Sequence, residues 1–127
     1  MPYAAVNGIE IYYESHGGGY PILFCHEFAG DYRSWDLQVG FFSRTYNVIT
    51  YCARGYPPSS VPESQINYSQ EEAVTDLKGL MKKLGIEKAH IVGLSMGGNV
   101  ALNFGLSHPK MASSLVVAGT GTGSDDP

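Results

Sequence analysis

The 127-residue sequence contains no apolar run close to the roughly 18 residues that a membrane-spanning helix needs. Its first residues show neither the basic nor the apolar region of a secretory signal peptide, so a cytoplasmic setting is expected. Basic residues are few, and the formal net charge of −4 leaves no basic stripe to neutralise a nucleic-acid backbone. We therefore expect neither a membrane nor a nucleic acid as partner, and a small molecule remains the expected ligand.

Cysteine is scarce as well. Cys25 and Cys52 each come at the end of an apolar run, and two cysteines are too few for a disulfide framework, so both are expected to be reduced core residues. The composition, with 43% apolar and 16% charged residues, is typical of a folded domain. A chain of this length has room for one hydrophobic core, and we expect a single domain over residues 1–127.

Apolar runs alternate with turn and cap signals along the chain. Asn7-Gly8 lies between the first two runs and indicates a hairpin, while Ser69 with Glu72 indicates the start of a helix that Gly85 ends. The expected strands cover residues 3–6, 9–13, 21–25, 46–51, 90–94 and 114–118, and the three main helices follow Asp31, Ser69 and Ser95. Strands separated by helices form right-handed crossovers. The pattern predicts an α/β fold in which an antiparallel hairpin precedes a mostly parallel sheet with helices on both faces.

The segment Gly93-Leu94-Ser95-Met96-Gly97 matches the pattern G-x-S-x-G, between an apolar strand and a helix. Such a turn must reverse the chain sharply to lift the serine hydroxyl above the sheet, and the two outer glycines remove side chains that would collide. The N–H of Met96, at the helix N-terminus, would then point to where an oxyanion forms. The alternative, that Ser95 only caps the helix of a non-enzymatic protein, leaves the flanking glycines unexplained.

Four short motifs together resemble the N-terminal half of α/β-hydrolase-fold enzymes of the esterase, lactonase and carbon–carbon hydrolase type. In chain order they are His26 after the third strand, Arg54-Gly55 with Ser59 after the fourth, the turn at Ser95, and Ser107-His108-Pro109 before the sixth strand. The resemblance implies that Phe28 supplies a second oxyanion N–H and that His26 supports its loop. Glu27 stands where the family usually has Gly, Ala29 where Pro is frequent, and Cys52 where Asp is common.

Metal and cofactor chemistry is not expected. His26-Glu27 could begin the zinc pattern H-E-x-x-H, but position 30 is Gly and not the second His. Arg33 and Arg54 are interpreted as surface or loop-bracing residues and not as clamps for a substrate. We therefore expect no metal and no organic cofactor.

A serine nucleophile needs a general base close by. His90 precedes Ser95 by five residues on the same predicted strand, roughly 16 Å away at about 3.3 Å per residue. His108 lies near the far end of the following helix, roughly 18–20 Å away at about 1.5 Å per residue, and His16 at the opposite edge of the sheet. Only His26 is expected at the edge that carries Ser95, and the resemblance gives it a supporting role.

In the family that the sequence resembles, the catalytic acid usually follows the seventh strand and the histidine follows the eighth. This sequence stops after the sixth predicted strand, where Asp125 and Asp126 are weak candidates for the acid. We therefore expect a C-terminally truncated domain that lacks the last two strands and the cap, exposes apolar surface, and is inactive by itself.

The expected activity of the full-length protein is hydrolysis of an ester, lactone or related carbonyl compound through an acyl-enzyme at Ser95. A serine at this position argues against the dehalogenase and epoxide-hydrolase branches of the family, which use Asp there. The rival hypothesis, prompted by the missing base, is a catalytically inactive α/β module that binds a small ligand or partner.

Overall fold

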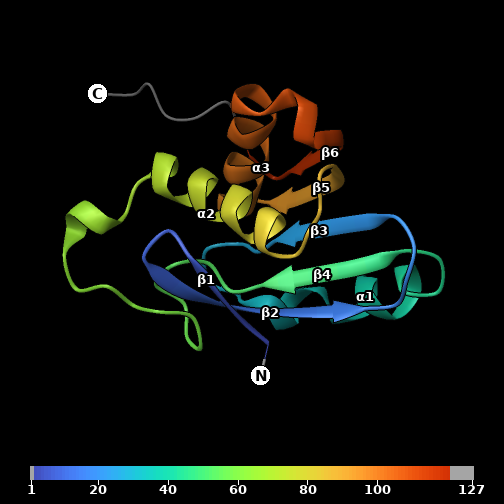
Figure 1. The fold of residues 1–127 in the computed structure, drawn as a ribbon, viewed down its shortest axis with the longest axis horizontal. Helices are drawn as coiled ribbons and strands as arrows, with labels where there is room; N and C mark the ends of the chain where they lie inside the picture. Colours follow the sequence, from blue (N-terminus) through green and yellow to red (C-terminus); the bar gives the residue numbers. More distant parts are fainter. Residues whose placement is uncertain (1, 121–127) are drawn as a thin grey trace.

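The computed structural model describes residues 2–120 and contains a six-stranded sheet in the order β1-β2-β4-β3-β5-β6 (Figure 1). The strands are β1 (Tyr3–Val6), β2 (Ile9–His16), β3 (Pro21–Cys25), β4 (Asn47–Tyr51), β5 (Ala89–Leu94) and β6 (Ala112–Ala118). β1 and β2 are antiparallel to each other, and β2 is antiparallel to β4, while β4, β3, β5 and β6 are parallel. This arrangement confirms the predicted fold class.

The hairpin is closed by Asn7 and Gly8, which both have positive φ (50° and 81°), as a type I′ turn requires. β2 continues three residues beyond the predicted strand at 9–13, and its end pairs with β4 down to His16 opposite Val48. The extension was missed because the residues that follow position 13 are polar and half or fully exposed, so they show no apolar alternation.

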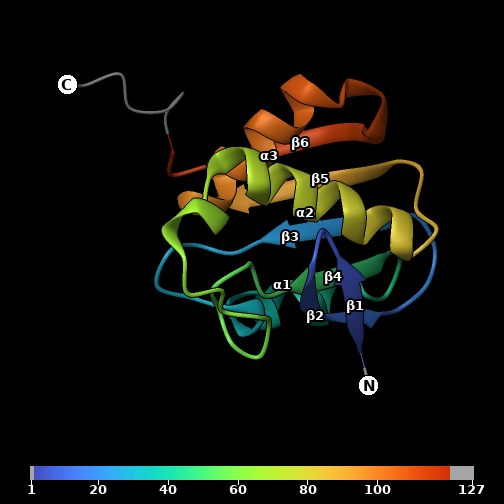
Figure 2. The same ribbon diagram turned by 60° about the vertical axis from the view of Figure 1, so that its left-hand side comes forward.

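Three α-helices cover the sheet: α1 (Asp36–Phe42), α2 (Gln70–Lys83) and α3 (Met96–Ser107). α1 lies on one face, and α2 and α3 lie on the other (Figures 1 and 2). Successive strand residues point to opposite faces, so Leu23 joins the large core under α2 and α3, whereas Phe24 joins a smaller core with Trp35. Cys25 and Cys52 are buried and unpaired, as predicted.

The helix caps follow the sequence with two differences. The Ser69 side chain accepts the N–H of Glu72 at 3.0 Å, but the Glu72 carboxylate lies 3.5 Å from Arg54, an ion pair that the expected capping box did not include. Asp31 caps a short 3₁₀ turn (Tyr32–Trp35) that leads into α1 instead of capping α1 itself. α2 ends as predicted, with Gly85 at φ +72°.

Apolar surface is exposed along the β6 side of the molecule. Within residues 2–120, β6 pairs only with β5, so its outer edge is free there. Leu115 and Val116 on this strand are 36% and 52% exposed, and Leu106 on α3 is 72% exposed. This exposure agrees with the expectation from the sequence. Across the same described residues, no helix has both the length and the apolar character that crossing a bilayer demands.

Candidate active site

Ser95 forms the turn between β5 and α3 in a conformation that non-glycine residues rarely adopt, with φ 55° and ψ −116°. Its backbone N–H donates to the carbonyl of Ala118 at the end of β6 at 2.9 Å, which ties the turn to the neighbouring strand. The side chain is exposed and makes no capping hydrogen bond to α3. The hydroxyl is therefore held above the carboxyl edge of the sheet and is available to a reactant.

Gly93 and Gly97 are required by close backbone contacts. A Cβ on Gly93 would lie 2.1 Å from the carbonyl oxygen of Gly97. A Cβ on Gly97 would lie 2.0 Å from the carbonyl oxygen of Cys25 and 2.6 Å from that of His26. The two glycines thus let the first turn of α3 rest directly against the end of β3, as the motif predicts.

His26 is 2% exposed and has both ring nitrogens engaged. Its Nε2 accepts the N–H of Ala53 at 3.0 Å, so Nδ1, which lies 2.8 Å from the carbonyl oxygen of Glu27, must carry the proton. Burial lowers the pKa of His26, which favours this neutral form. A base needs a free lone pair facing the nucleophile, so His26 links two loops and is not available as the base for Ser95.

The same contact orients the peptide between Glu27 and Phe28. The Glu27 carbonyl accepts from His26 and, at 3.1 Å, from the N–H of Gly30. Because the C=O and N–H of a trans peptide point in opposite directions, the Phe28 N–H faces away from the His26 ring. The N–H of Met96 is also free of an intrahelical acceptor, since Met96 is the first residue of α3.

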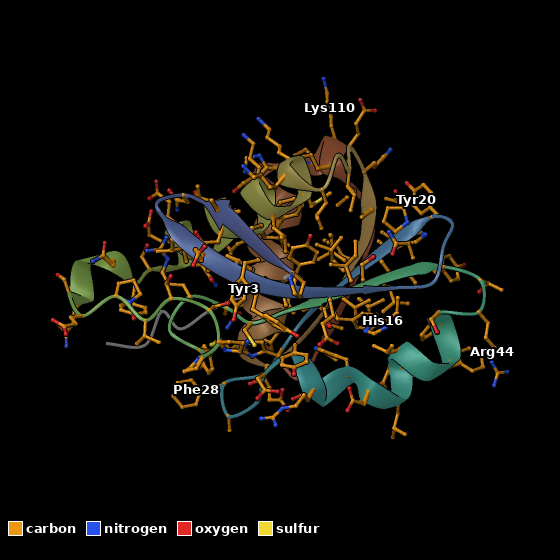
Figure 3. The ribbon with its side chains drawn as sticks, turned by 60° about the horizontal axis from the view of Figure 1, so that its bottom comes forward. Tyr3, His16, Tyr20, Phe28, Arg44 and Lys110 are labelled. Atoms are coloured by element: carbon orange, nitrogen blue, oxygen red, sulfur yellow. The ribbon has the colours of Figure 1, made fainter. Side chains whose placement is uncertain are left out.

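The side chain of Phe28 is 72% exposed and projects from a loop at one end of the molecule, while Tyr20 lies at the other end (Figure 3). Tyr56, which the sequence motifs did not single out, fills the space beside it. The Tyr56 ring meets the His26 ring edge-on at 4.7 Å and the Phe28 ring at 6.5 Å, and its hydroxyl lies 3.6 Å from the Met96 sulfur.

Tyr56 thus contacts all three residues that frame the expected oxyanion site. Burial raises the pKa of its hydroxyl, so Tyr56 is neutral at physiological pH. Its position follows from topology, since the loops after β3, β4 and β5 leave the sheet at the same edge. An aromatic residue in the loop after β4 was therefore a candidate that the motifs alone did not identify.

Arg54 is buried and braces the loop after β4, which confirms the loop-bracing interpretation. Its guanidinium donates to both carboxylate oxygens of Asp76 on α2, at 2.9 and 3.0 Å, and to the carbonyls of Asn67 and Asn7. Asp76 was missed, although an acid on the apolar stripe of α2 needs a buried partner. Arg33 is exposed and pairs with Asp31.

The remaining histidines lie away from Ser95. His90, near the start of β5, has Nδ1 2.6 Å from the Ser114 hydroxyl, His108 caps the far end of α3, and His16 pairs with Glu14. Asp125 and Asp126 lie outside the described residues.

Within residues 2–120, no group of three or more His, Cys, Asp or Glu side chains is placed to hold a metal ion.

A cavity of about 470 Å³ reaches Met96, the residue that follows Ser95. Its lining also includes Phe28, Tyr56, Tyr68 and Val100. The residues whose N–H groups would hold an oxyanion therefore also form part of the wall of a pocket that is large enough for a small organic molecule.

The neutral His26 makes stability depend on pH. Its pKa is lower in the folded protein than the ordinary value of 6.5, so the unfolded chain binds the proton first. The stabilisation is therefore complete above about pH 6.5 and is lost as the pH falls towards the lowered pKa, at a rate of up to about 1.4 kcal/mol per pH unit. We expect urea unfolding between pH 7.5 and 5 to show a smaller loss of stability for His26→Gln than for the wild type. Ser107→Ala, at the exposed end of α3, serves as the control because it changes no titrating side chain, and it should keep the wild-type slope. Equal slopes for His26→Gln and the wild type would contradict the assigned neutral state.

Comparison with known proteins agrees with the fold. The family model described as alpha/beta hydrolase fold matches residues 20–127. A protein of Synechocystis sp. with the provisional name non-heme chloroperoxidase is 41% identical over 103 residues, which are 76% of this chain and 37% of the relative. Epoxide hydrolase 3 of Mus musculus is 30% identical over 120 residues, 93% of this chain and 33% of that protein.

Among solved structures, the enol-lactonase from Burkholderia xenovorans LB400 superimposes with a TM-score of 0.89 at 32% identity. The match covers 94% of this chain and 46% of that one. The chain thus spans about a third of the length of these two curated relatives and just under half of the lactonase.

Proposed function

Since this chain belongs to the α/β-hydrolase-fold family, we propose that the complete protein is a serine hydrolase that cleaves an ester, lactone or related carbonyl compound. The observation that carries the proposal is the strained turn at Ser95, which presents a hydroxyl free of capping hydrogen bonds. Strain of this kind at an exposed polar residue is typical of reacting groups.

In the proposed reaction, the Ser95 oxygen forms a bond to the carbonyl carbon of the substrate while a base takes its proton. The carbonyl oxygen becomes negatively charged and accepts hydrogen bonds from the N–H groups of Met96 and Phe28. The bond to the leaving group then breaks, and the leaving group takes the proton from the base. Water repeats the same steps on the acyl-enzyme and releases Ser95.

The base and the acid belong, in this proposal, to the additional length that the relatives have. The support comes from His26, whose Nε2 is occupied by the Ala53 N–H, and from the distant positions of His16, His90 and His108. Relatives named as epoxide hydrolases share the fold, but a serine nucleophile forms an acyl-enzyme and therefore favours a carbonyl substrate.

The second candidate function is a non-catalytic module that binds a small ligand in the cavity beside Phe28. It is favoured by the absence, among the four histidines of the described chain, of one placed as the base. A fluorophosphonate probe separates the two functions, because it reacts covalently with an activated serine and leaves a ligand-binding module unmodified.

The test treats the complete protein with the probe and locates the adduct by mass spectrometry. We expect one adduct, at Ser95, and none in Ser95→Ala, while Ser107→Ala, at the exposed far end of α3, labels like the wild type. The 127-residue chain alone should label far more slowly, since none of the histidines within residues 2–120 is placed as the base. A folded complete protein that does not label at Ser95 would establish the binding module instead.

A further inference from the structure

The cavity of about 470 Å³ that reaches Met96 is bounded mainly by aromatic and aliphatic side chains. Phe28 and Met96 stand where it meets the proposed oxyanion site, and Tyr56 joins them through its contacts with both residues. Pockets of roughly 300–1,000 Å³ with apolar walls are typical of sites for small organic ligands. The cavity is thus placed to hold the part of a substrate next to the reacting carbonyl.

The charged residues that line the cavity are Arg54 and Asp76, and they neutralise each other. The guanidinium makes four hydrogen bonds, two to Asp76 and two to the carbonyls of Asn67 and Asn7 at 3.1 and 3.2 Å, and Nη1 also faces the Glu72 carboxylate at 3.5 Å. A carboxylate on the bound group would lose its hydration here and gain no cation from the described lining, which is unfavourable. The cavity therefore favours an uncharged group.

The hydroxyls in the lining are also engaged. Tyr51 donates to the Cys25 sulfur at 3.5 Å, Tyr68 donates to the Pro62 carbonyl, and the Ser69 oxygen caps α2. Tyr56 has the Met96 sulfur as its acceptor. Apart from the exposed amide of Gln70 at the rim, what the cavity offers a ligand is mainly the rings and aliphatic carbons of its walls. Aromatic rings favour edge-on or offset contacts with another ring, as Tyr56 already shows against His26.

The direction in which a substrate enters follows from the proposed chemistry. The base must return its proton to the leaving group, so the leaving group lies on the side of the base. In the proposed reaction, the carbonyl oxygen lies at the N–H groups of Met96 and Phe28, and both residues also line the cavity. The acyl group stays bonded to Ser95 after the leaving group has departed, so we assign the cavity to the acyl group.

We propose that this cavity binds the acyl group of an uncharged aromatic carboxylic ester, and that Tyr56 is the side chain that sets this preference. The inference rests on the proposed serine-hydrolase function and adds a substrate class to it. Tyr56 acts through its ring, which forms one wall of the cavity and holds Phe28 and Met96 in place.

The test uses the complete protein and three esters with the same leaving group: p-nitrophenyl acetate, benzoate and 4-carboxybenzoate. Because intrinsic reactivity differs between acyl groups, the quantity compared is the ratio of kcat/KM for benzoate to that for acetate. We expect Tyr56→Ala to lower this ratio by about tenfold or more, in line with the loss of an apolar pocket contact. Tyr56→Phe, which retains the ring, should keep the ratio within about threefold of the wild type. The 4-carboxybenzoate should react at least about tenfold less efficiently than benzoate.

The matched control is Tyr20→Ala, which removes a 43% exposed tyrosine at the opposite end of the molecule and should leave the ratio unchanged (Figure 3). An unchanged ratio in Tyr56→Ala, or equal efficiency with benzoate and 4-carboxybenzoate, would overturn the assigned substrate class while Ser95-dependent hydrolysis stands. Failure of the wild type to hydrolyse any of the three esters, or hydrolysis that survives Ser95→Ala, would refute the proposed function and this inference with it.

Discussion

Replacing Ser95 with alanine in the complete protein is expected to lower kcat/KM for p-nitrophenyl acetate by at least about 10⁴-fold. In the proposed mechanism, the substitution removes the atom that forms the acyl-enzyme and leaves the N–H groups of Met96 and Phe28 in place. Because these proposed donors would still stabilise an oxyanion, we expect a small residual rate over water. Steady-state hydrolysis, followed by release of p-nitrophenolate, measures the effect.

The loss must be separated from a loss of folding. Alanine at position 95 keeps the backbone N–H that donates to Ala118 and makes the strained φ of 55° no harder to adopt than serine does. The thermal midpoint of Ser95→Ala should therefore stay close to that of the wild type, as should that of Ser107→Ala, which should also retain full activity. A Ser95→Ala protein that keeps its rate would exclude Ser95 as the nucleophile.

Much of the fold could be predicted from short-range signals. Asn7-Gly8, Gly85 and the apolar runs of β3 and β5 specify local conformation through their own side chains, and the structure reproduces them. The end of β2 could not be predicted from short-range signals. Its polar residues belong to the sheet because β4 lies beside them, and that neighbour is distant in sequence.

The turn at Ser95 was predictable for a different reason. Gly93 and Gly97 lie where two backbone segments are in close contact. Glycine in the G-x-S-x-G pattern indicates such a contact, because a side chain at either position would collide. Tyr56 gives no such signal. Its contacts with Phe28 and Met96 arise because the segments after β3, β4 and β5 meet at one sheet edge, so the topology had to be known before the residue could be placed.

The sequence predicted the roles of Arg54 and His26 only in part. The sequence suggested that both support loops, but not what they bind. The partner of Arg54 lies 22 residues away on α2, and the partner of His26 Nε2 is the backbone of Ala53, which has no sequence signature. Buried polar contacts of this kind depend on tertiary structure, and the motif alone did not identify them.

The buried pair between Arg54 and Asp76 leads to the second large effect. Asp76→Ala is expected to lower the free energy of unfolding by about 3–5 kcal/mol, because the buried guanidinium of Arg54 loses the carboxylate that accepts two of its hydrogen bonds. The Arg54 and Asp76 side chains are 6% and 3% exposed, so water does not compensate for the missing carboxylate. Urea denaturation at pH 7.5 measures the change.

Glu72→Gln is the matched control, since Glu72 lies on the same helix and faces the same guanidinium. Its carboxylate is 3.5 Å from Arg54 and its side chain is 33% exposed, so solvent screens the interaction and the loss should stay below about 1 kcal/mol. The double substitution Arg54→Met with Asp76→Leu removes both charges and should recover much of the stability lost in Asp76→Ala. If Asp76→Ala and Glu72→Gln destabilise the protein equally, the pair with Asp76 is not what fixes the loop after β4. Recovery of stability in the double variant would show that Asp76→Ala is destabilising because it leaves one buried charge unpaired. The loop that carries Tyr56 then requires only that positions 54 and 76 carry no net charge together.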